Sequence, residues 1–230
     1  GIILSTAMFT AVTTSISSLR HCMIEYAKFN TGTWHGAGYD LSADSNEKLR
    51  TDPQITASTS MECLGFSLLE DFANKYKPYL CVYGINDNFT ELLPIHLTQG
   101  RMPQNSNEIL LSQTVQTNAC MDWKLNDSLT LELGTRTDWM GNQLSNQSAF
   151  ITKDDLDSDN TDNSLPDTTT ALDSEAISVG AENFHPAGTR TYTIVGFFER
   201  PFFEGSASYT ALTASEGSTD HTYDLYIQTN

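Results

Sequence analysis

Apolar side chains along residues 1–30 follow a helical rhythm, and polar side chains fill the positions between them. From residue 9 onward the apolar positions are spaced alternately by three and four residues, which keeps them on one side of a helix. These positions are Phe9, Val12, Ile16, Leu19, Met23 and Tyr26. The pattern predicts one long helix, ended by Asn30 or Gly32, that carries a narrow coiled-coil-like seam.

The first part of this helix is apolar enough to enter a membrane. Residues 1–19 carry no charge, and we interpret residues 1–12 as the outer end of a transmembrane helix that continues above the bilayer as a Ser- and Thr-rich stalk. The apolar run is shorter than the ~20 residues that span a bilayer, so we expect the sequence to be a piece of a longer chain. An ordinary amphipathic core helix is the alternative that periodicity leaves open. No second run of spanning length follows, which predicts one aqueous compartment for the remainder.

The remainder alternates short strand patterns with few helical ones. A helix is expected at residues 42–50 with Ser42 as its N-cap, and another from Ser112 to about Met121. The predicted strands cover residues 33–41, 54–69, 79–85, 108–111, 128–133, 191–198, 209–212 and 222–228. Strand 79–85 is almost continuously apolar, which is typical of a strand that is covered on both faces.

A long acidic interval separates two of these strands. Residues 141–190 hold nine acidic residues against Lys153 and Arg190, so we interpret them as a solvated, partly disordered insertion in a hairpin. Asp155, Asp157 and Asp159 alternate like the start of a calcium-binding EF-hand loop. Asn160 and Pro166 stand where that loop needs Gly and Glu, which favours a plain acidic loop.

Composition and motifs argue against several classes of function. The net charge of −17 repels nucleic acid. The sequence has no phosphate-binding loop, no H-E-x-x-H and no G-x-S-x-G, so we expect no cofactor, no metal site and no enzyme. Its four scattered cysteines leave two alternatives open, namely a Cys63–Cys81 disulfide or free thiols, of which free thiols are favoured.

An ordered set of short motifs resembles the extracytoplasmic core domain of FtsX/MacB-like ABC transporter permeases. The motifs are GTWH at residues 32–35, GRMP at 100–103, NEILLS at 107–112, KLNDSLTL at 124–131 and YTIVGF at 192–197. Asn126 stands where this family usually has Gly, which is a mild departure because Asn also reaches positive φ. The resemblance covers nearly the whole chain except the acidic insertion.

This resemblance implies an α+β fold with three parts. Residues 1–32 would form the end of transmembrane helix 1 and the stalk helix. Residues 33–97 and 215–230 would form an α/β porter-like lobe, and residues 98–214 an inserted β-rich lobe that includes the flexible insertion at 141–190. Family porter lobes continue after their last strand, so we expect further chain beyond Asn230.

The resemblance also implies a permease subunit in the cell membrane, with this domain on the extracytoplasmic side. Its partners would be a cytoplasmic ABC ATPase, a second permease copy or homologue, and an extracellular protein or peptide, but not nucleic acid. The implied activity is mechanical coupling of ATP hydrolysis to substrate export or to a signal outside the membrane. The alternative is a membrane-tethered extracellular module that binds a ligand or a protein without any transporter.

One aromatic segment is a candidate contact for a partner. Phe202 and Phe203 follow the break at Pro201 and lie between charged residues. They either belong to the core of the inserted lobe or form an exposed patch. In the second case, replacing both with Ser would reduce coupling to a partner and leave folding intact.

Overall fold

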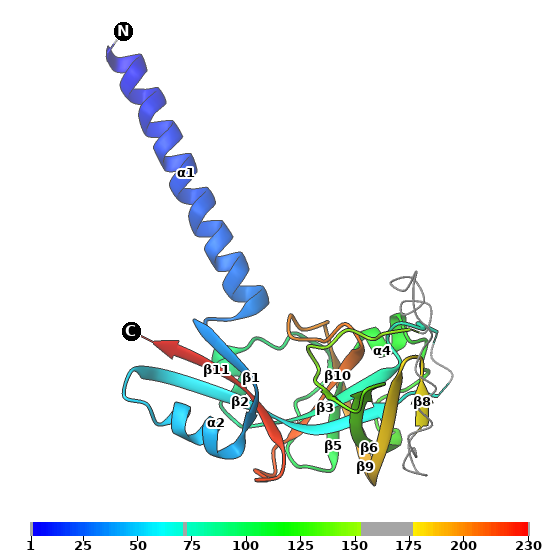
Figure 1. Ribbon diagram of the computed structural model, residues 1–230. Coiled ribbons are helices and arrows are strands. Elements are labelled where there is room, and N and C mark those ends of the chain that lie inside the picture. The colour runs from blue at the N-terminus through cyan, green and yellow to red at the C-terminus, as the bar shows by residue number, and fades with distance from the viewer. Residues whose placement is uncertain (1, 71–72, 153–176, 230) are drawn as a thin grey trace, which may run out of the picture.

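A long helix stands away from a strand-rich body (Figure 1). The computed structural model describes residues 2–70, 73–152 and 177–229. Helix α1 (Ile2–Thr31) has 30 residues and therefore a length of about 45 Å. None of its side chains is buried, and it joins the body only through its C-terminal end (Figure 1). The fold is α+β with an N-terminal stalk helix, as the sequence predicts.

In the residues that the structure describes, the body consists mainly of strands, with three short helices between them. The helices are α2 (Ala43–Arg50), α3 (Phe89–Leu92) and α4 (Thr114–Thr117). The strands are β1 (Gly36–Ser42), β2 (Ile55–Leu68), β3 (Tyr79–Ile85), β4 (Leu97–Gly100), β5 (Glu108–Ser112), β6 (Ser128–Asp138), β7 (Gln143–Leu144), β8 (Ile177–Val179), β9 (Glu182–Phe198), β10 (Ser208–Ala214) and β11 (Thr222–Thr229).

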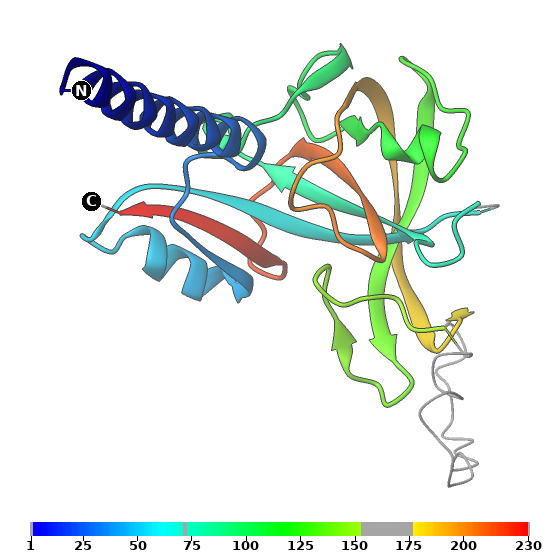
Figure 2. The same ribbon diagram turned by 90° about the horizontal axis from the view of Figure 1, so that it is seen from above.

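The strands form one mixed sheet, most of which closes on itself. The order is β1-β11-β2-β3-β10-β5-β9-β6-β7, and β4 and β8 both pair with β9. An additional pairing of Phe66 on β2 with Gly134 on β6 closes the ring β2-β3-β10-β5-β9-β6. Strands β1 and β11 extend this ring along the first half of β2, and α2 lies beside that extension (Figure 2).

Two apolar cores follow from the alternation of side chains along the ring strands. Leu80, Val82, Ile194 and their neighbours from all six ring strands form one cluster, which fills the ring. The side chains at the alternate positions of β3, Tyr79, Cys81 and Tyr83, point to the other face and belong to a second cluster. That cluster also includes residues of α3, of β11 and of the β9–β10 connection, so it binds the ring to its extension.

Strong local signals in the sequence are confirmed. Strand β3 coincides with the predicted strand at residues 79–85, and all of its residues are buried. Ser42 caps α2, because its side chain accepts a hydrogen bond of 3.3 Å from the Ser45 N–H. All four cysteines are free thiols. The division into two lobes stays a prediction.

The helix expected from Ser112 to Met121 is wrong in length and in its cap. The structure has a single turn, α4, whose N-cap is Gln113. The chain leaves the helix where Ala119 turns into the core and Cys120 adopts a positive φ of 62°. Ala119 is fully buried, so this segment is fixed by packing instead of by helix propensity.

The boundaries of the acidic insertion are also wrong. Residues 141–152 and 177–190 include β7, β8 and the first half of β9, all paired in the sheet. An ion pair joins the fully buried Arg136 on β6 to Glu182 on β9, with Nη2 2.9 Å from Oε2. This ion pair stabilises the part of the β6–β9 hairpin that continues beyond its apolar residues. The candidate calcium residues Asp155, Asp157 and Asp159 lie outside the described residues.

Candidate functional site: the junction of the stalk helix and the sheet

The stalk helix ends on a glycine that no other residue can replace without strain. Gly32 has a φ of +95° and its N–H donates to the Lys28 carbonyl over 2.9 Å. A Cβ at this position would lie 2.0 Å from the carbonyl oxygen of Leu92. The same Leu92 oxygen accepts a hydrogen bond of 3.1 Å from the Thr33 N–H. The end of the helix is therefore held directly against the end of α3.

His96 makes a second attachment between the helix and the body. Its ring stacks on the Phe29 ring with centroids 4.0 Å apart, and its Nε2 lies 2.8 Å from the Phe29 carbonyl oxygen. The His96 carbonyl accepts a hydrogen bond of 2.9 Å from Glu199, the residue after β9. One residue thus links the last turn of α1 to the beginning of the β9–β10 connection.

Trp34 makes the third attachment and connects the helix with the second core. Its Nε1–H donates to the Thr31 carbonyl over 2.7 Å, which binds the ring to the helix end. The ring stacks on Phe202 at 5.8 Å and meets the edge of Tyr226 at 5.4 Å. Such aromatic pairs contribute about 0.5–1.5 kcal/mol beyond their area. The end of the helix is therefore in contact with β11 and with Phe202.

Of the two alternatives for Phe202 and Phe203, the structure places Phe203 in the core and packs the partly buried Phe202 against it. Phe203 is only 5% exposed and packs edge-on against Phe89 at 6.0 Å. Phe202 is half-buried between Trp34 and Tyr226. The proline break turns this segment inward across the second core instead of outward. A contact of Phe202 with a partner stays a prediction.

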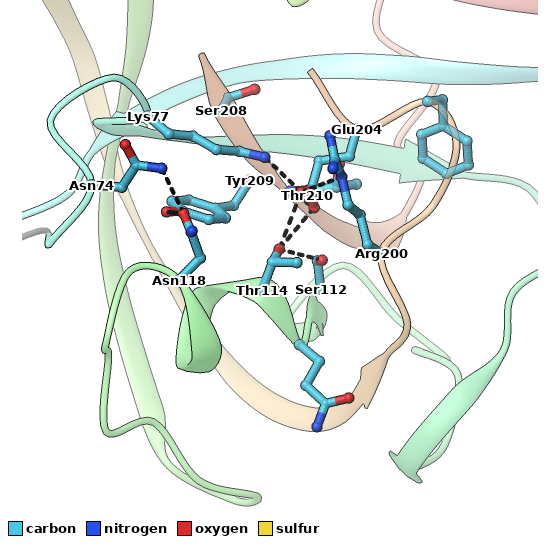
Figure 3. Close-up of polar contacts among 12 residues, drawn as sticks. Asn74, Lys77, Ser112, Thr114, Asn118, Arg200, Glu204, Ser208, Tyr209 and Thr210 are labelled. Atoms are coloured by element: carbon cyan, nitrogen blue, oxygen red, sulfur yellow. Dashed lines mark hydrogen bonds and ion pairs between the residues drawn. The ribbon is translucent and has the colours of Figure 1, made fainter. Parts of the chain in front are cut away.

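Glu204, directly after these phenylalanines, is the centre of a buried polar network (Figure 3). Its side chain is fully buried and accepts from Lys77 Nζ at 2.6 Å and from Thr114 Oγ1 at 3.1 Å. The Thr210 N–H and Arg200 Nε lie 3.3 and 3.4 Å from its oxygens. Burial lowers the pKa of Lys77, and the Glu204 charge offsets part of that shift.

Tyr209 extends this network towards the ring of six strands. Its hydroxyl donates to Asn118 Oδ1 over 2.5 Å, and Asn74 donates to the same oxygen over 2.7 Å. Lys77 Nζ lies 4.6 Å above the Tyr209 ring. Burial and the Glu204 charge raise the pKa of Tyr209 to about 12. The segment from Phe202 to Glu204 therefore contacts the helix junction at one end and α4 with the loop before β3 at the other.

A cleft lies on the other side of β2, where the ring and its extension separate. Its volume is about 710 Å³, and Cys63, Phe66, Thr135, Asn146 and His221 are among its lining residues. This size is typical of sites for small ligands. Among the described residues, no group of three His, Cys, Asp or Glu side chains is placed to hold a metal ion.

Glu62 fixes the loop between β10 and β11 at the edge of this cleft. Its buried carboxylate accepts from the N–H groups of Gly217 and Ser218 at 2.9 Å and from His221 Nδ1 at 2.7 Å. Burial alone would raise the pKa of Glu62, but these bonds and one from Ser215 outweigh it and lower the pKa. The sequence gives no local signal for this contact, because the partners are more than 150 residues apart.

The predicted stalk seam lies entirely on the free surface of α1. Its six members, Phe9, Val12, Ile16, Leu19, Met23 and Tyr26, are between 55% and 72% exposed. Within the described residues, α1 is the one helix that is long and apolar enough to cross a membrane. Whether the seam meets a second helix stays a prediction.

No known family profile matches the chain, and no curated protein matches it. Three solved structures are similar over 83%, 83% and 84% of this chain, each with a TM-score of 0.40. They are a domain of a permease protein from Porphyromonas gingivalis (15% identity, 69% of that chain), the extracellular domain of the ABC-type transporter YknZ from Gram-positive bacteria (8%, 73%) and the periplasmic region of MacB from Actinobacillus actinomycetemcomitans (10%, 66%).

Proposed function

We propose that this chain is the extracytoplasmic part of an ABC transporter permease subunit in the cell membrane. The stalk helix α1 passes movements of the membrane part to the sheet body, and a cytoplasmic ATPase partner supplies the energy. A second permease copy or homologue and an extracellular protein or peptide complete the proposed assembly. Catalysis takes no part in this role.

The observation that carries the proposal is the rigid attachment of an otherwise free helix. Helix α1 has no buried side chain, yet its end is held against the body at three places. Thr33 donates to Leu92, Phe29 contacts His96, and Trp34 packs on Phe202 and Tyr226. A flexible tether needs no such attachment, whereas a lever that transmits motion does. The continuous contacts from Trp34 through Phe202 to Glu204 give that motion a route into the ring.

The competing function is a membrane-tethered binding module, and the cleft beside β2 favours it. A cavity of about 710 Å³ is large enough to hold a small ligand without any movement of α1. The two functions differ in what ATP hydrolysis does to the body. A permease subunit changes the position of its body with the nucleotide state, and a tethered module does not.

The test uses the full-length protein, tagged and purified from its source membrane in nanodiscs. We expect an ATPase subunit to co-purify, and we expect ATP to change the accessibility of the body to a hydrophilic label. The Trp34→Ala/His96→Ala variant should keep the ATPase subunit and its basal hydrolysis but lose the ATP-dependent change. His185→Ala, far from the junction, is the matched control. An intact full-length protein that co-purifies with no ATPase contradicts the proposal.

A further inference from the structure

Two cysteine side chains lie beside each other on β2 and β3, at the point where the ring and its extension separate. The pairing of β11 with β2 ends at Cys63, and the contact of β2 with β6 follows three residues later at Phe66. Cys63 is opposite Tyr83 on β3, and Cys81 is two residues from Tyr83, so both cysteines turn to the same face of the sheet. On that face Cys81 belongs to the second core, and Cys63 packs against it.

A β-bulge brings the two thiols closer together than a regular sheet would. Diagonal neighbours in a regular antiparallel pair are farther apart than a disulfide requires. Between Cys63 and Gly65, however, β2 has one extra residue, Leu64, and a bulge of this kind increases the local twist of its strand. Burial and the neighbouring Cys63 thiol raise the pKa of Cys81 well above its usual value, as expected for two thiols in contact.

The two thiols differ in their access to solvent. Cys63 is half-buried and lines the cleft of about 710 Å³ beside β2. Cys81 lies behind it and is 0% exposed. A reagent dissolved in the cleft therefore meets Cys63 first, and Cys81 is placed to react with whatever forms on Cys63. An accessible thiol with a second thiol next to it is the arrangement that redox-active cysteines use.

We propose that Cys63 and Cys81 form a reversible disulfide when a small disulfide molecule enters the cleft. The Cys63 thiolate attacks one sulfur atom of that molecule, whose S–S bond breaks, and one thiol leaves with the proton that Cys63 released. Cys81 then loses its proton and attacks the Cys63 sulfur atom, and the second thiol leaves. Two protein thiols are oxidised, and one external disulfide is reduced to two thiols.

The new bond would join the extension of the sheet to the ring. Cys63 is the last residue of β2 that pairs with β11, whereas Cys81 lies on β3, a strand of the ring. Oxidation would hold β2 to β3 covalently at this position and would remove a thiol from the wall of the cleft. The chemistry does not depend on the proposed transport function, although the proposed extracytoplasmic location is one in which disulfides persist.

The test is treatment of the full chain in detergent micelles with bis(2-hydroxyethyl) disulfide, followed by peptic digestion at low pH and mass spectrometry. We expect a mixed disulfide on Cys63 first, and then a cross-linked pair of peptides that joins Cys63 to Cys81. Cys120 is exposed and should keep its mixed disulfide, which makes it the internal control. In the Cys81→Ala variant the mixed disulfide on Cys63 should persist as well.

The pH dependence of the second step is a further readout. Below the raised pKa of Cys81, its thiolate fraction increases tenfold for each pH unit. After removal of excess reagent, the mixed disulfide on Cys63 should therefore convert to the cross-link about tenfold faster at pH 8 than at pH 7.

Any of three outcomes in the original chain would overturn the proposal, whether or not the Cys81→Ala variant folds. If Cys120 reacts and Cys63 does not, the cleft does not admit the reagent to the thiol. If the mixed disulfide on Cys63 lasts as long as that on Cys120, Cys81 is out of reach. If the cross-link forms at the same rate in urea, the folded arrangement does not promote it.

Discussion

His96 contacts Phe29 twice, through a ring stack at 4.0 Å and through Nε2 placed 2.8 Å from the Phe29 carbonyl oxygen. A residue of the body thereby fixes both the side chain and the backbone of the last turn of α1. The contact lies on the exposed side of the junction, where solvent would otherwise fray the helix end. It is therefore a sensitive place to weaken the coupling between helix and body without unfolding either.

The His96→Ala variant should loosen the end of α1 selectively. We expect faster amide hydrogen exchange in residues 29–34, because both contacts with Phe29 are lost, and unchanged exchange in the ring strands. Mass spectrometry of peptic fragments measures this directly. His185→Ala, which alters a contact with Thr137 in the β6–β9 hairpin, should leave the helix end unchanged. Uniformly faster exchange in both variants would argue against a local role of His96.

Gly32→Ala should destabilise the junction more than the same change at another left-handed glycine. Both Gly32 and Gly141 have positive φ, at +95° and +86°, but only at Gly32 would the new Cβ meet backbone. We expect Gly141→Ala to cost about 1 kcal/mol of unfolding free energy and Gly32→Ala at least about twice as much. Urea unfolding followed by circular dichroism measures both. Equal losses of unfolding free energy in the two variants would show that the Leu92 backbone moves aside without an energetic cost.

Phe202 and Phe203 should respond differently to truncation. Phe203→Ala removes a buried ring and should cost about 3–5 kcal/mol, whereas half-buried Phe202→Ala should cost roughly half as much. Phe202→Ala should in addition disturb Trp34, which is visible in the tryptophan fluorescence spectrum. If the Phe203 variant were as stable as the original chain, the segment would lie outside the core, which is the other alternative that the sequence leaves open.

Lys77→Met should be far more costly than a comparable change on the surface. It leaves the fully buried Glu204 without its nearest cation, which typically costs about 3–5 kcal/mol. Lys124→Met breaks an exposed pair with Asp122 and should cost less than about 1 kcal/mol. Thermal unfolding of the two variants gives the comparison. The double variant Lys77→Met/Glu204→Leu should recover part of the loss, and a further loss instead would contradict the ion-pair account.

Asp224 should make the folded state less stable as the pH rises from about 4 to about 6. Burial raises its folded pKa to about 6, so the folded state holds a proton that the unfolded state has already released in this window. The unfolding free energy therefore falls with rising pH, by about 2 kcal/mol for this group. The unfolding free energy of the original chain, measured relative to that of the Asp224→Asn variant, should fall by that amount between pH 4 and pH 7. A difference that stays constant would show that the Asp224 pKa is not raised.

The sequence predicts the elements whose signals are local. Strand β3 follows from its continuous apolar run, the start of α2 from the Ser42 cap, and the end of α1 from Gly32. The extension of β6 and β9 could not be predicted in this way, because it depends on the buried pair Arg136–Glu182, and charged residues in a polar stretch indicate solvent exposure. The length of β6 and β9 is therefore decided by contacts between segments that are distant in the sequence.

The candidate site was predicted only in part, for the same reason. The GTWH motif at residues 32–35 lies at the junction but did not indicate a site there, and His96 gives no periodic or motif signal. Phe202 is a candidate partner contact from the sequence, but its burial depends on two rings that the sequence does not place beside it. Trp34 is more than a hundred residues away, and Tyr226 lies on the strand after β10. Only the folded arrangement brings these rings together.

Helix α1 and the body should move as one unit. This is measured by the distance distribution between spin labels at Arg20→Cys on α1 and Glu132→Cys on β6, in a chain with its native cysteines replaced. Double electron–electron resonance should give one narrow distribution, which Trp34→Ala/His96→Ala broadens. A broad distribution in the original junction, unchanged by the double variant, would show a flexible tether and contradict the account.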